Sequence, residues 1–169
     1  MPGSLGEAQP FGAKLVSVFP ENFSLDRPSH QGVVVLFDPE TGAPVCVAHA
    51  GEITAIRTAA ASAVATDALA VADARRLTIL GYGEQAATHI RAISHVRSLS
   101  AVRVWGRSLE RARAFAKRMS DESGLEVNAS ESVEAALEGA EIVCAVTAAR
   151  EPILESRWVA GGTHINLVG

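Results

Sequence analysis

The chain has 169 residues, of which 48% are hydrophobic and 20% are charged, and its formal net charge at pH 7 is −4. This composition excludes an intrinsically disordered chain and is typical of a folded globular protein with a hydrophobic core. The mildly acidic, evenly mixed charges argue against a nucleic-acid partner, and no segment approaches the roughly 20 consecutive apolar residues of a membrane span.

Residues 1–70 are predicted to form three strands followed by one helix, as part of a β-rich domain. Apolar and β-branched runs place the strands at 13–19, 32–37 and 45–48. The segment between the last two strands, Asp-Pro-Glu-Thr-Gly-Ala-Pro, is typical of a hairpin loop, and the polar segment 20–31 predicts a longer loop. The alanine-rich segment 52–69 predicts a helix.

Residues 71–169 alternate between strand and helix patterns, which predicts an α/β fold with a Rossmann-type, doubly wound parallel sheet. Strands are expected at 77–81, 101–105, 125–128, 141–147 and 163–168. Helices are expected at 84–97, 108–122 and 131–138, with Ser108 and Ser130 as N-caps of the last two. Because such a domain often has a sixth strand, we expect this sheet to be incomplete after its fifth strand and the chain to be an internal piece of a longer enzyme.

A dinucleotide-binding fingerprint, Gly-x-Gly-x-x-Ala, lies between the first strand and the first helix of this second part. Gly81 permits the tight turn, Gly83 lets the backbone approach a pyrophosphate, and Ala86 lets the helix pack close to the strand. The free N–H groups at the helix start favour a phosphate. The alternative interpretation is an ordinary strand-turn-helix corner without a ligand.

The end of the second strand predicts which dinucleotide is bound. A site that prefers NAD(H) usually carries Asp or Glu here, about 20 residues past the glycines, to accept from the ribose 2′-hydroxyl. This chain has no acid at that point but has Arg107 and Ser108, with Arg111 one turn further on. Several donors beside a fixed cation suit a 2′-phosphate, so we expect NADP(H), with NAD(H) as the alternative. Arg107 could also be a solvated loop arginine without this role.

The cysteines and histidines do not indicate a metal or disulfide site. Cys46 and Cys144 are distant in sequence and are expected to be buried, reduced thiols, and the first six residues lack the features of a secretory signal, so we expect a cytoplasmic protein. No metal site is expected, because four of the five histidines lack metal-ligand spacing and are interpreted as structural or surface residues. They are His49, His89, His95 and His164.

Segments along nearly the whole chain together resemble the ornithine cyclodeaminase/mu-crystallin family. They span residues 13–22, 28–42, 52–69, 79–90, 104–108, 141–154 and 164–169. The Arg-Thr-Ala-Ala helix joined to a Gly-x-Gly-x-Gln-Ala turn is the most specific part of the likeness. The resemblance implies a Rossmann domain beside a substrate and dimerisation domain, a homodimer in the full-length protein, and hydride exchange between a nicotinamide and the α-carbon of a small amino or imino acid.

The resemblance also implies roles for individual residues. Lys14 and Arg57 match residues that hold a substrate carboxylate, and Ser29 and His30 match residues that face the cofactor and substrate pocket. The matching cofactor residues are Gly81, Tyr82, Gly83, Glu84, Gln85, Ala86, Arg107, Ser108, Thr147, Ala148 and Val168. Simpler roles also fit the substrate residues: an edge lysine, a helix arginine with an extended stem, and a loop histidine.

Two departures from the family pattern affect these expectations. Members that use NADP often carry Asn where this chain has Gly106, so one side-chain contact to the cofactor is expected to be missing. The chain also matches an interior stretch of the family pattern, without the upstream elements or the downstream region that resembles the catalytic aspartate. We therefore identify no catalytic residue in this chain.

The predicted function is reduction of the C=N bond of a small imino acid by NADPH, as in a ketimine or cyclic imino acid reductase. Lys14 and Arg57 would orient the substrate through its carboxylate. Three alternatives remain open at this point. They are an ornithine cyclodeaminase that forms proline and ammonia, a non-catalytic NADPH-binding protein of the mu-crystallin kind, and a truncated product, inactive and without a stable fold.

Overall fold

The structure, a computed structural model, describes residues 2–4, 9–25, 27 and 30–169, with the backbone alone at 20, 23, 24 and 30. Contacts between residues divide the chain into two compact units, Met1–Ile56 and Arg57–Gly169. The division falls inside helix α1 (Ala50–Leu69), because the second half of that helix packs on the second unit. The domain boundary expected after residue 70, at the end of this helix, stays a prediction.

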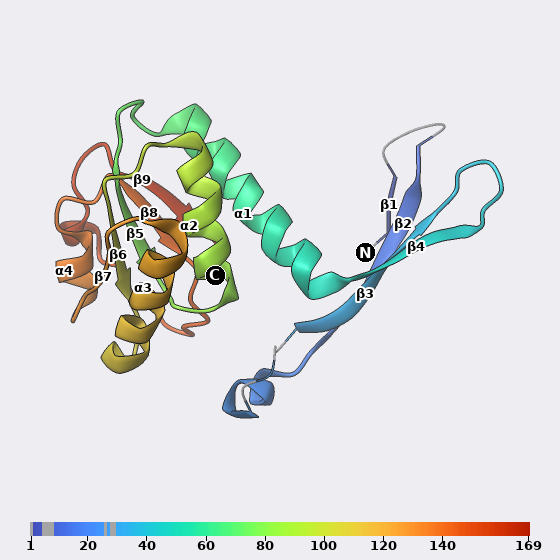
Figure 1. Ribbon diagram of the computed structural model, residues 1–169, viewed down its shortest axis with the longest axis horizontal. Helices are drawn as coiled ribbons and strands as arrows, with labels where there is room; N and C mark the ends of the chain where they lie inside the picture. The colour runs from blue at the N-terminus through green and yellow to red at the C-terminus, as the bar shows by residue number, and fades with distance from the viewer. Residues whose placement is uncertain (1, 5–8, 26, 28–29) are drawn as a thin grey trace. The chain divides into compact units, whose positions relative to one another are not determined.

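The first unit contains an antiparallel sheet in the order β1-β2-β3-β4 (Figure 1). Its strands are β1 (Pro2–Ser4), β2 (Phe11–Val18), β3 (His30–Phe37) and β4 (Pro44–His49). Three of these strands were predicted. Strand β1 was not, because Pro-Gly-Ser has little strand propensity and is extended only through its pairing with β2. The expected loop 20–31 contains a short 3-10 helix, η1 (Pro20–Leu25).

The predicted hairpin between β3 and β4 is confirmed, and Asp38 closes its turn. The Asp38 carboxylate accepts hydrogen bonds from the N–H groups of Glu40 and Thr41, at 3.0 and 2.8 Å, and from the Thr41 hydroxyl at 2.8 Å. These donors, first among them the Thr41 N–H, lower the pKa of Asp38. The turn is therefore held by a side chain that mimics backbone pairing.

The second unit is a five-stranded parallel sheet in the order β7-β6-β5-β8-β9, which confirms the predicted α/β fold class. The strands are β5 (Arg76–Leu80), β6 (Ala101–Trp105), β7 (Val127–Ala129), β8 (Ile142–Ala145) and β9 (His164–Leu167). The other elements are α2 (Glu84–Val96), α3 (Leu109–Ser123), α4 (Val133–Leu137) and the 3-10 helix η2 (Ser156–Trp158). The order reverses between β5 and β8, which is the topological switch point of a doubly wound sheet.

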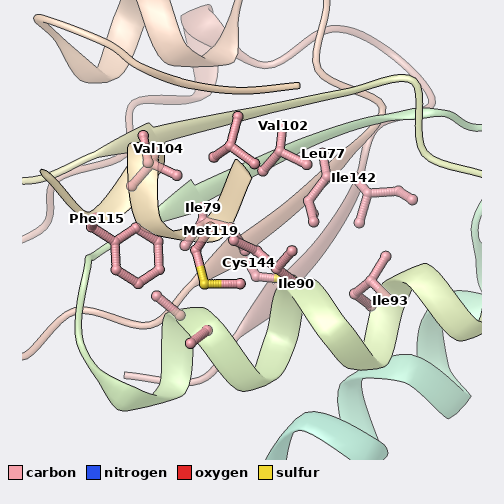
Figure 2. Packing of buried hydrophobic residues seen from close by; sticks show 14 of the residues in the cluster. Leu77, Ile79, Ile90, Ile93, Val102, Val104, Phe115, Met119, Ile142 and Cys144 are labelled. Atoms are coloured by element: carbon pink, nitrogen blue, oxygen red, sulfur yellow. The ribbon is translucent and has the colours of Figure 1, made fainter. Parts of the chain in front are cut away.

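Helices cover both faces of this sheet, as the continuously buried central strands require. Leu77 and Ile79 of β5 face the core shared with α2 and α3, and Figure 2 shows Ile90 of α2 and Met119 of α3 in the same cluster. Thr78 and Leu80 face the opposite way, where the Thr78 hydroxyl donates to the carbonyl oxygen of Ala136 in α4 at 2.6 Å. Both faces are therefore buried, which explains the continuous apolar strands.

One predicted helix cap is correct and one is wrong. Ser108 caps α3, and its hydroxyl accepts from the N–H of Arg111 at 3.3 Å. Ser130 does not cap α4, because its N–H instead donates to the carbonyl oxygen of Val104 and continues the pairing beside β6. Ser132 is the cap, accepting from the N–H of Ala135 at 3.0 Å, so α4 starts later than predicted.

Candidate nucleotide-binding site

The carboxyl ends of four parallel strands bring most of the predicted cofactor residues to one edge of the sheet. The turns at this edge are joined by backbone hydrogen bonds: Gly81 N–H to Trp105 O at 2.7 Å, and Val146 N–H to Leu80 O at 2.9 Å. Val168, just after β9, donates to Ala145 O at 3.0 Å. Ligands of doubly wound sheets bind outside this edge, next to the switch point.

The fold requires glycine at only one of the two glycine positions of the fingerprint. Gly81 has φ 130°, and a Cβ atom there would lie 3.0 Å from the carbonyl oxygen of Val146, so only glycine fits the turn. Gly83 is exposed, and a Cβ atom there would meet nothing within 4 Å. The fold therefore does not require glycine at 83, whereas close approach of a ligand would. Ala86 is fully buried in the core, as the fingerprint predicts.

The N-terminus of α2 lacks the side-chain cap that α3 and α4 have. Gly83 is its N-cap and offers no side chain, whereas Ser108 and Ser132 cap the other two helices. The first N–H groups of a helix have no partner within the helix, and their dipoles favour an anion. Glu84 and Gln85 begin α2, so their N–H groups lie at this uncapped end and can hold a phosphate.

Two buried polar atoms without a hydrogen-bond partner lie on the helices beside this turn. They are Gln85 Oε1 on α2 and Thr58 Oγ1 on α1. One turn further along each helix, Ser62 Oγ lies 3.0 Å from Nε2 of the buried His89, so Thr58 and Gln85 are expected to lie near each other. A buried polar atom without a partner is costly, and a bound ligand would supply one. Thr58 carried no signal in the sequence beyond its place in the Arg-Thr-Ala-Ala helix.

The residues expected at the cofactor's 2′-phosphate follow β6. Arg107 and Arg111 are exposed, and Ser108 keeps its O–H free to donate while its oxygen caps α3. Tyr82 is half-buried against the core, and a Cβ atom on Gly106 would overlap its ring carbons Cδ1 and Cε1. The predicted residues after β6 thus provide two guanidinium groups and a hydroxyl donor, and none of them is acidic.

The remaining predicted cofactor residues follow the other strands. Thr147 is half-buried and Ala148 is exposed after β8, and Val168 is half-buried after β9. A Cβ atom at Gly169 would lie 3.2 Å from the carbonyl oxygen of Thr147, so these two strand ends approach each other closely. Ser29 lies outside the described residues.

The expected substrate residues belong to different units. Lys14 is half-buried on β2, and its Nζ donates to the Thr54 hydroxyl, which donates to Ala50 O at 2.6 Å. Strand β1 pairs only with residues 11–13 of β2, so among the described strands β2 pairs at Lys14 with β3 alone. Arg57 is exposed and is the first residue of the second unit, while His30 begins β3. The pairing of Lys14 with Arg57 stays a prediction.

Across the described part of the chain, no three His, Cys, Asp or Glu residues are placed to hold a metal ion. No helix in that part is long and apolar enough to cross a bilayer. Both cysteines are free, but only Cys144 is buried, and burial raises the pKa of its thiol to about 12. Cys46 is exposed on β4, contrary to the expectation that both thiols are buried.

Comparison with known proteins identifies the family of this chain. The model of the ornithine cyclodeaminase/mu-crystallin family matches residues 1–169. The chain belongs to that family. Within the family it is 39% identical over 169 residues to ketimine reductase mu-crystallin from Mus musculus, which covers 100% of this chain and 53% of the relative. The resemblance inferred from the sequence is confirmed.

Solved structures agree with the ornithine cyclodeaminase/mu-crystallin assignment. Thermococcus litoralis Δ1-pyrroline-2-carboxylate reductase, in complex with NADH and L-proline, has a TM-score of 0.93 at 39% identity, covering 98% of this chain and 51% of that chain. A lysine cyclodeaminase that recognises L-lysine, L-ornithine and L-2,4-diaminobutyric acid has a TM-score of 0.89 at 32% identity, covering 100% and 49%. The chain therefore spans about half the length of the family members that it matches.

Proposed function

We propose that this chain is the nucleotide-binding and carboxylate-binding part of an oxidoreductase that reduces the C=N bond of small imino acids with NADPH. The observation that carries the proposal is the uncapped N-terminus of α2 behind a glycine that the fold itself does not require. Relatives named ketimine reductase and pyrroline-2-carboxylate reductase support the imino acid as substrate class.

The residues present fit a nicotinamide dinucleotide. Gly83 and the first turn of α2 would hold the pyrophosphate, and Gln85 Oε1 would gain a partner that the protein does not provide. When bound, the reduced cofactor supplies the hydride that the C=N carbon accepts. Thr147 and Val168, at the ends of β8 and β9, would border the nicotinamide half of the ligand.

The preference for NADPH over NADH rests on the charges after β6. Arg107 and Ser108 offer donors to a 2′-phosphate, and the residues directly after β6 include no acid to accept from a 2′-hydroxyl; Glu110 follows only in the first turn of α3. Arg111, one turn along α3, adds a second cation. The solved relative is in complex with NADH, so the proposed preference for NADPH rests on this chain's own residues and not on that relative.

Lys14 and Arg57 are proposed to hold the carboxylate of the substrate, and His30 is proposed to contribute to substrate binding. A guanidinium can bind a carboxylate through two parallel hydrogen bonds, and an ammonium adds a point charge. Holding the carboxylate in this way would orient the neighbouring C=N carbon for hydride transfer. The Thr54 hydroxyl, which accepts from Lys14, would position the ammonium.

A cyclodeaminase is the second candidate, because a lysine cyclodeaminase aligns over 100% of this chain. Such an enzyme would convert ornithine into proline and release ammonia without net consumption of cofactor. Product analysis with ornithine distinguishes the two: a reductase gives no ammonia, whereas a cyclodeaminase releases it.

We further propose that the protein acts as a cytoplasmic homodimer. The four-stranded sheet of the first unit leaves large apolar side chains exposed, among them Leu15 at 63% and Val47 at 68%. We propose that a second copy of the protein covers part of this apolar surface.

The test is titration of the chain with NADPH and NADH, followed by assay of imino acid reduction. In the full-length protein, Arg57→Ala is expected to raise the KM for Δ1-pyrroline-2-carboxylate roughly 10- to 100-fold, because a charge-assisted contact to the carboxylate is lost. Arg91→Ala is the matched control, because Arg91 is an exposed arginine of α2 that forms an ion pair with Glu122. Failure to bind either nucleotide would contradict the proposed function, and an unchanged KM for Arg57→Ala would contradict the carboxylate contact.

A further inference from the structure

The turn after β5 and the turn after β6 are joined at neighbouring residues. Gly81 N–H donates to the carbonyl oxygen of Trp105 at 2.7 Å. The next residue on each side is Tyr82 and Gly106, and a Cβ atom added to Gly106 would overlap the Tyr82 ring at Cδ1 and Cε1. The ring of Tyr82 therefore occupies the space that any side chain at position 106 would need.

The backbone does not explain why residue 106 is glycine. The described glycines with positive φ are Gly42, Gly81, Gly124, Gly139 and Gly162, and Gly106 is not among them. An L-residue could therefore adopt the backbone conformation at 106 without strain. The nearest obstacle is the aromatic ring of Tyr82, which is half-buried and packs against the core cluster that includes Ala86. Displacing the ring would therefore cost packing.

Position 106 is where a dinucleotide fold reads the adenosine ribose. A carboxylate immediately after the second strand accepts from the 2′-hydroxyl of NAD(H) and repels the 2′-phosphate of NADP(H). In this chain the Tyr82 ring occupies the space of a side chain at that position, and the next residues along the chain are Arg107 and Ser108. The selectivity of the site thus depends on a residue in the glycine-rich turn as well as on the residues after β6.

We propose that Tyr82 determines the cofactor preference of this protein by excluding an acidic side chain from position 106. The proposal rests on the proposed nicotinamide function and names the residue pair that sets its specificity. It also accounts for Gly106, where the sequence alone indicates only a missing contact. An acid at 106 requires the loss of the ring, so the two positions should change together.

The test compares wild type, Tyr82→Ala, Gly106→Asp and the double variant Y82A/G106D, by thermal melting and by fluorescence titration with NADPH and NADH. Gly106→Asp alone is expected to melt at a lower temperature, because the carboxylate overlaps the ring. The double variant is expected to recover part of that loss. Relative to Tyr82→Ala, it should shift the ratio of NADPH to NADH affinity toward NADH by roughly 10- to 100-fold, since an acid now accepts from the 2′-hydroxyl.

Two controls separate the ring from general effects. Tyr82→Phe keeps the ring, so Gly106→Asp should destabilise the Tyr82→Phe protein as much as it destabilises wild type. Ser130→Asp adds an acid at the end of the neighbouring strand, where it should leave the affinity ratio unchanged. If Gly106→Asp fails to fold, the comparison of Tyr82→Ala with Y82A/G106D remains decisive, because both lack the ring.

The outcomes distinguish this proposal from the proposed function. If wild type binds a nicotinamide dinucleotide but the double variant neither recovers stability nor changes the affinity ratio, the role of Tyr82 is wrong and the function stands. If wild type binds neither nucleotide, the function and the role of Tyr82 in preference are both wrong. Recovery of stability together with a shift toward NADH supports the proposal.

Discussion

His89 is a fully buried histidine that the sequence left among structural or surface residues. Its Nδ1 lies 2.7 Å from Gln85 O, and its Nε2 lies 3.0 Å from Ser62 Oγ. Burial lowers the pKa of His89 below 6.5, although the hydrogen bond with the Gln85 carbonyl partly opposes this. The ring is therefore neutral in the folded protein at pH 7, and its protonation requires an uncompensated charge in the core.

The lowered pKa of His89 predicts a loss of stability in mild acid. As the pH falls below about 6.5, the unfolded state binds a proton that the folded state does not, so the free energy of unfolding falls by up to about 1.4 kcal/mol per pH unit. Urea unfolding at pH 7.5, 6.5 and 5.5 measures this slope. His89→Gln should flatten it, whereas His95→Gln, on the exposed face of the same helix, should not. Asp38 and Glu141, whose pKa values are lowered, lose their contribution only in stronger acid.

At the scale of elements, Arg97 connects the ends of two helices. It follows α2, and its side chain is 8% exposed. Its Nη2 donates to the carbonyl oxygens of Thr66 and Asp67 in the last turn of α1 and of Ala70 just after it, at 2.9 to 3.2 Å. Its Nη1 donates to the Asp67 carboxylate at 3.0 Å. One guanidinium thus donates to several carbonyl groups at the C-terminal end of α1, where carbonyls lack partners further along the helix; Thr66 O also accepts from the Ala70 N–H at 3.0 Å.

Removing this guanidinium is expected to destabilise the second unit. Arg97→Ala should lower the free energy of unfolding by about 2–4 kcal/mol, because buried carbonyl groups lose their donors. Arg97→Lys should recover only part of the loss, since an ammonium cannot reach several carbonyls in a fixed plane. Arg91→Ala removes an exposed ion pair of the same helix and should cost about 0.5 kcal/mol or less. Equal destabilisation by the Arg97 and Arg91 variants would refute this role.

At the scale of the whole molecule, the two units differ in how well they bury apolar surface. The parallel-sheet unit has a core of fully buried strand and helix residues (Figure 2). The antiparallel sheet instead exposes large apolar side chains, and Val45 and Val47 lie on its edge strand β4. An exposed apolar edge strand is a surface at which chains associate.

This exposure predicts that the chain self-associates through its first unit. Sedimentation of wild type should show a dimer or a larger species, and Val47→Lys should shift it toward monomer, because the charge opposes burial of the strand. Ala114→Lys, on an exposed position of α3, is the matched control and should leave the association unchanged. A wild-type chain that sediments as a monomer at micromolar concentration would contradict this expectation.

Features that depend on neighbouring residues were determined by the sequence alone. The order of strands and helices from residue 71 onward, the β3–β4 hairpin and the turn at Gly81 follow from local periodicity and from turn-forming residues. The family assignment was also within reach, because its motifs are short and contiguous. The Ser130 cap was wrong since the choice between two serines depended on pairing of the chain beside β6.

Only the tertiary structure decided which residues act on one another from distant positions. It shows that the Tyr82 ring fills the space that a side chain at position 106 would need, and that Arg97 donates to carbonyl groups of α1. It also shows that Thr58 and Gln85 retain unpaired buried oxygens, and that Cys46 is exposed while Cys144 is not. None of these follows from residue type or spacing, because each depends on the packing of segments separated by many residues. Local periodicity specifies which elements form, whereas burial and contact between elements determine which side chains remain free to bind a ligand.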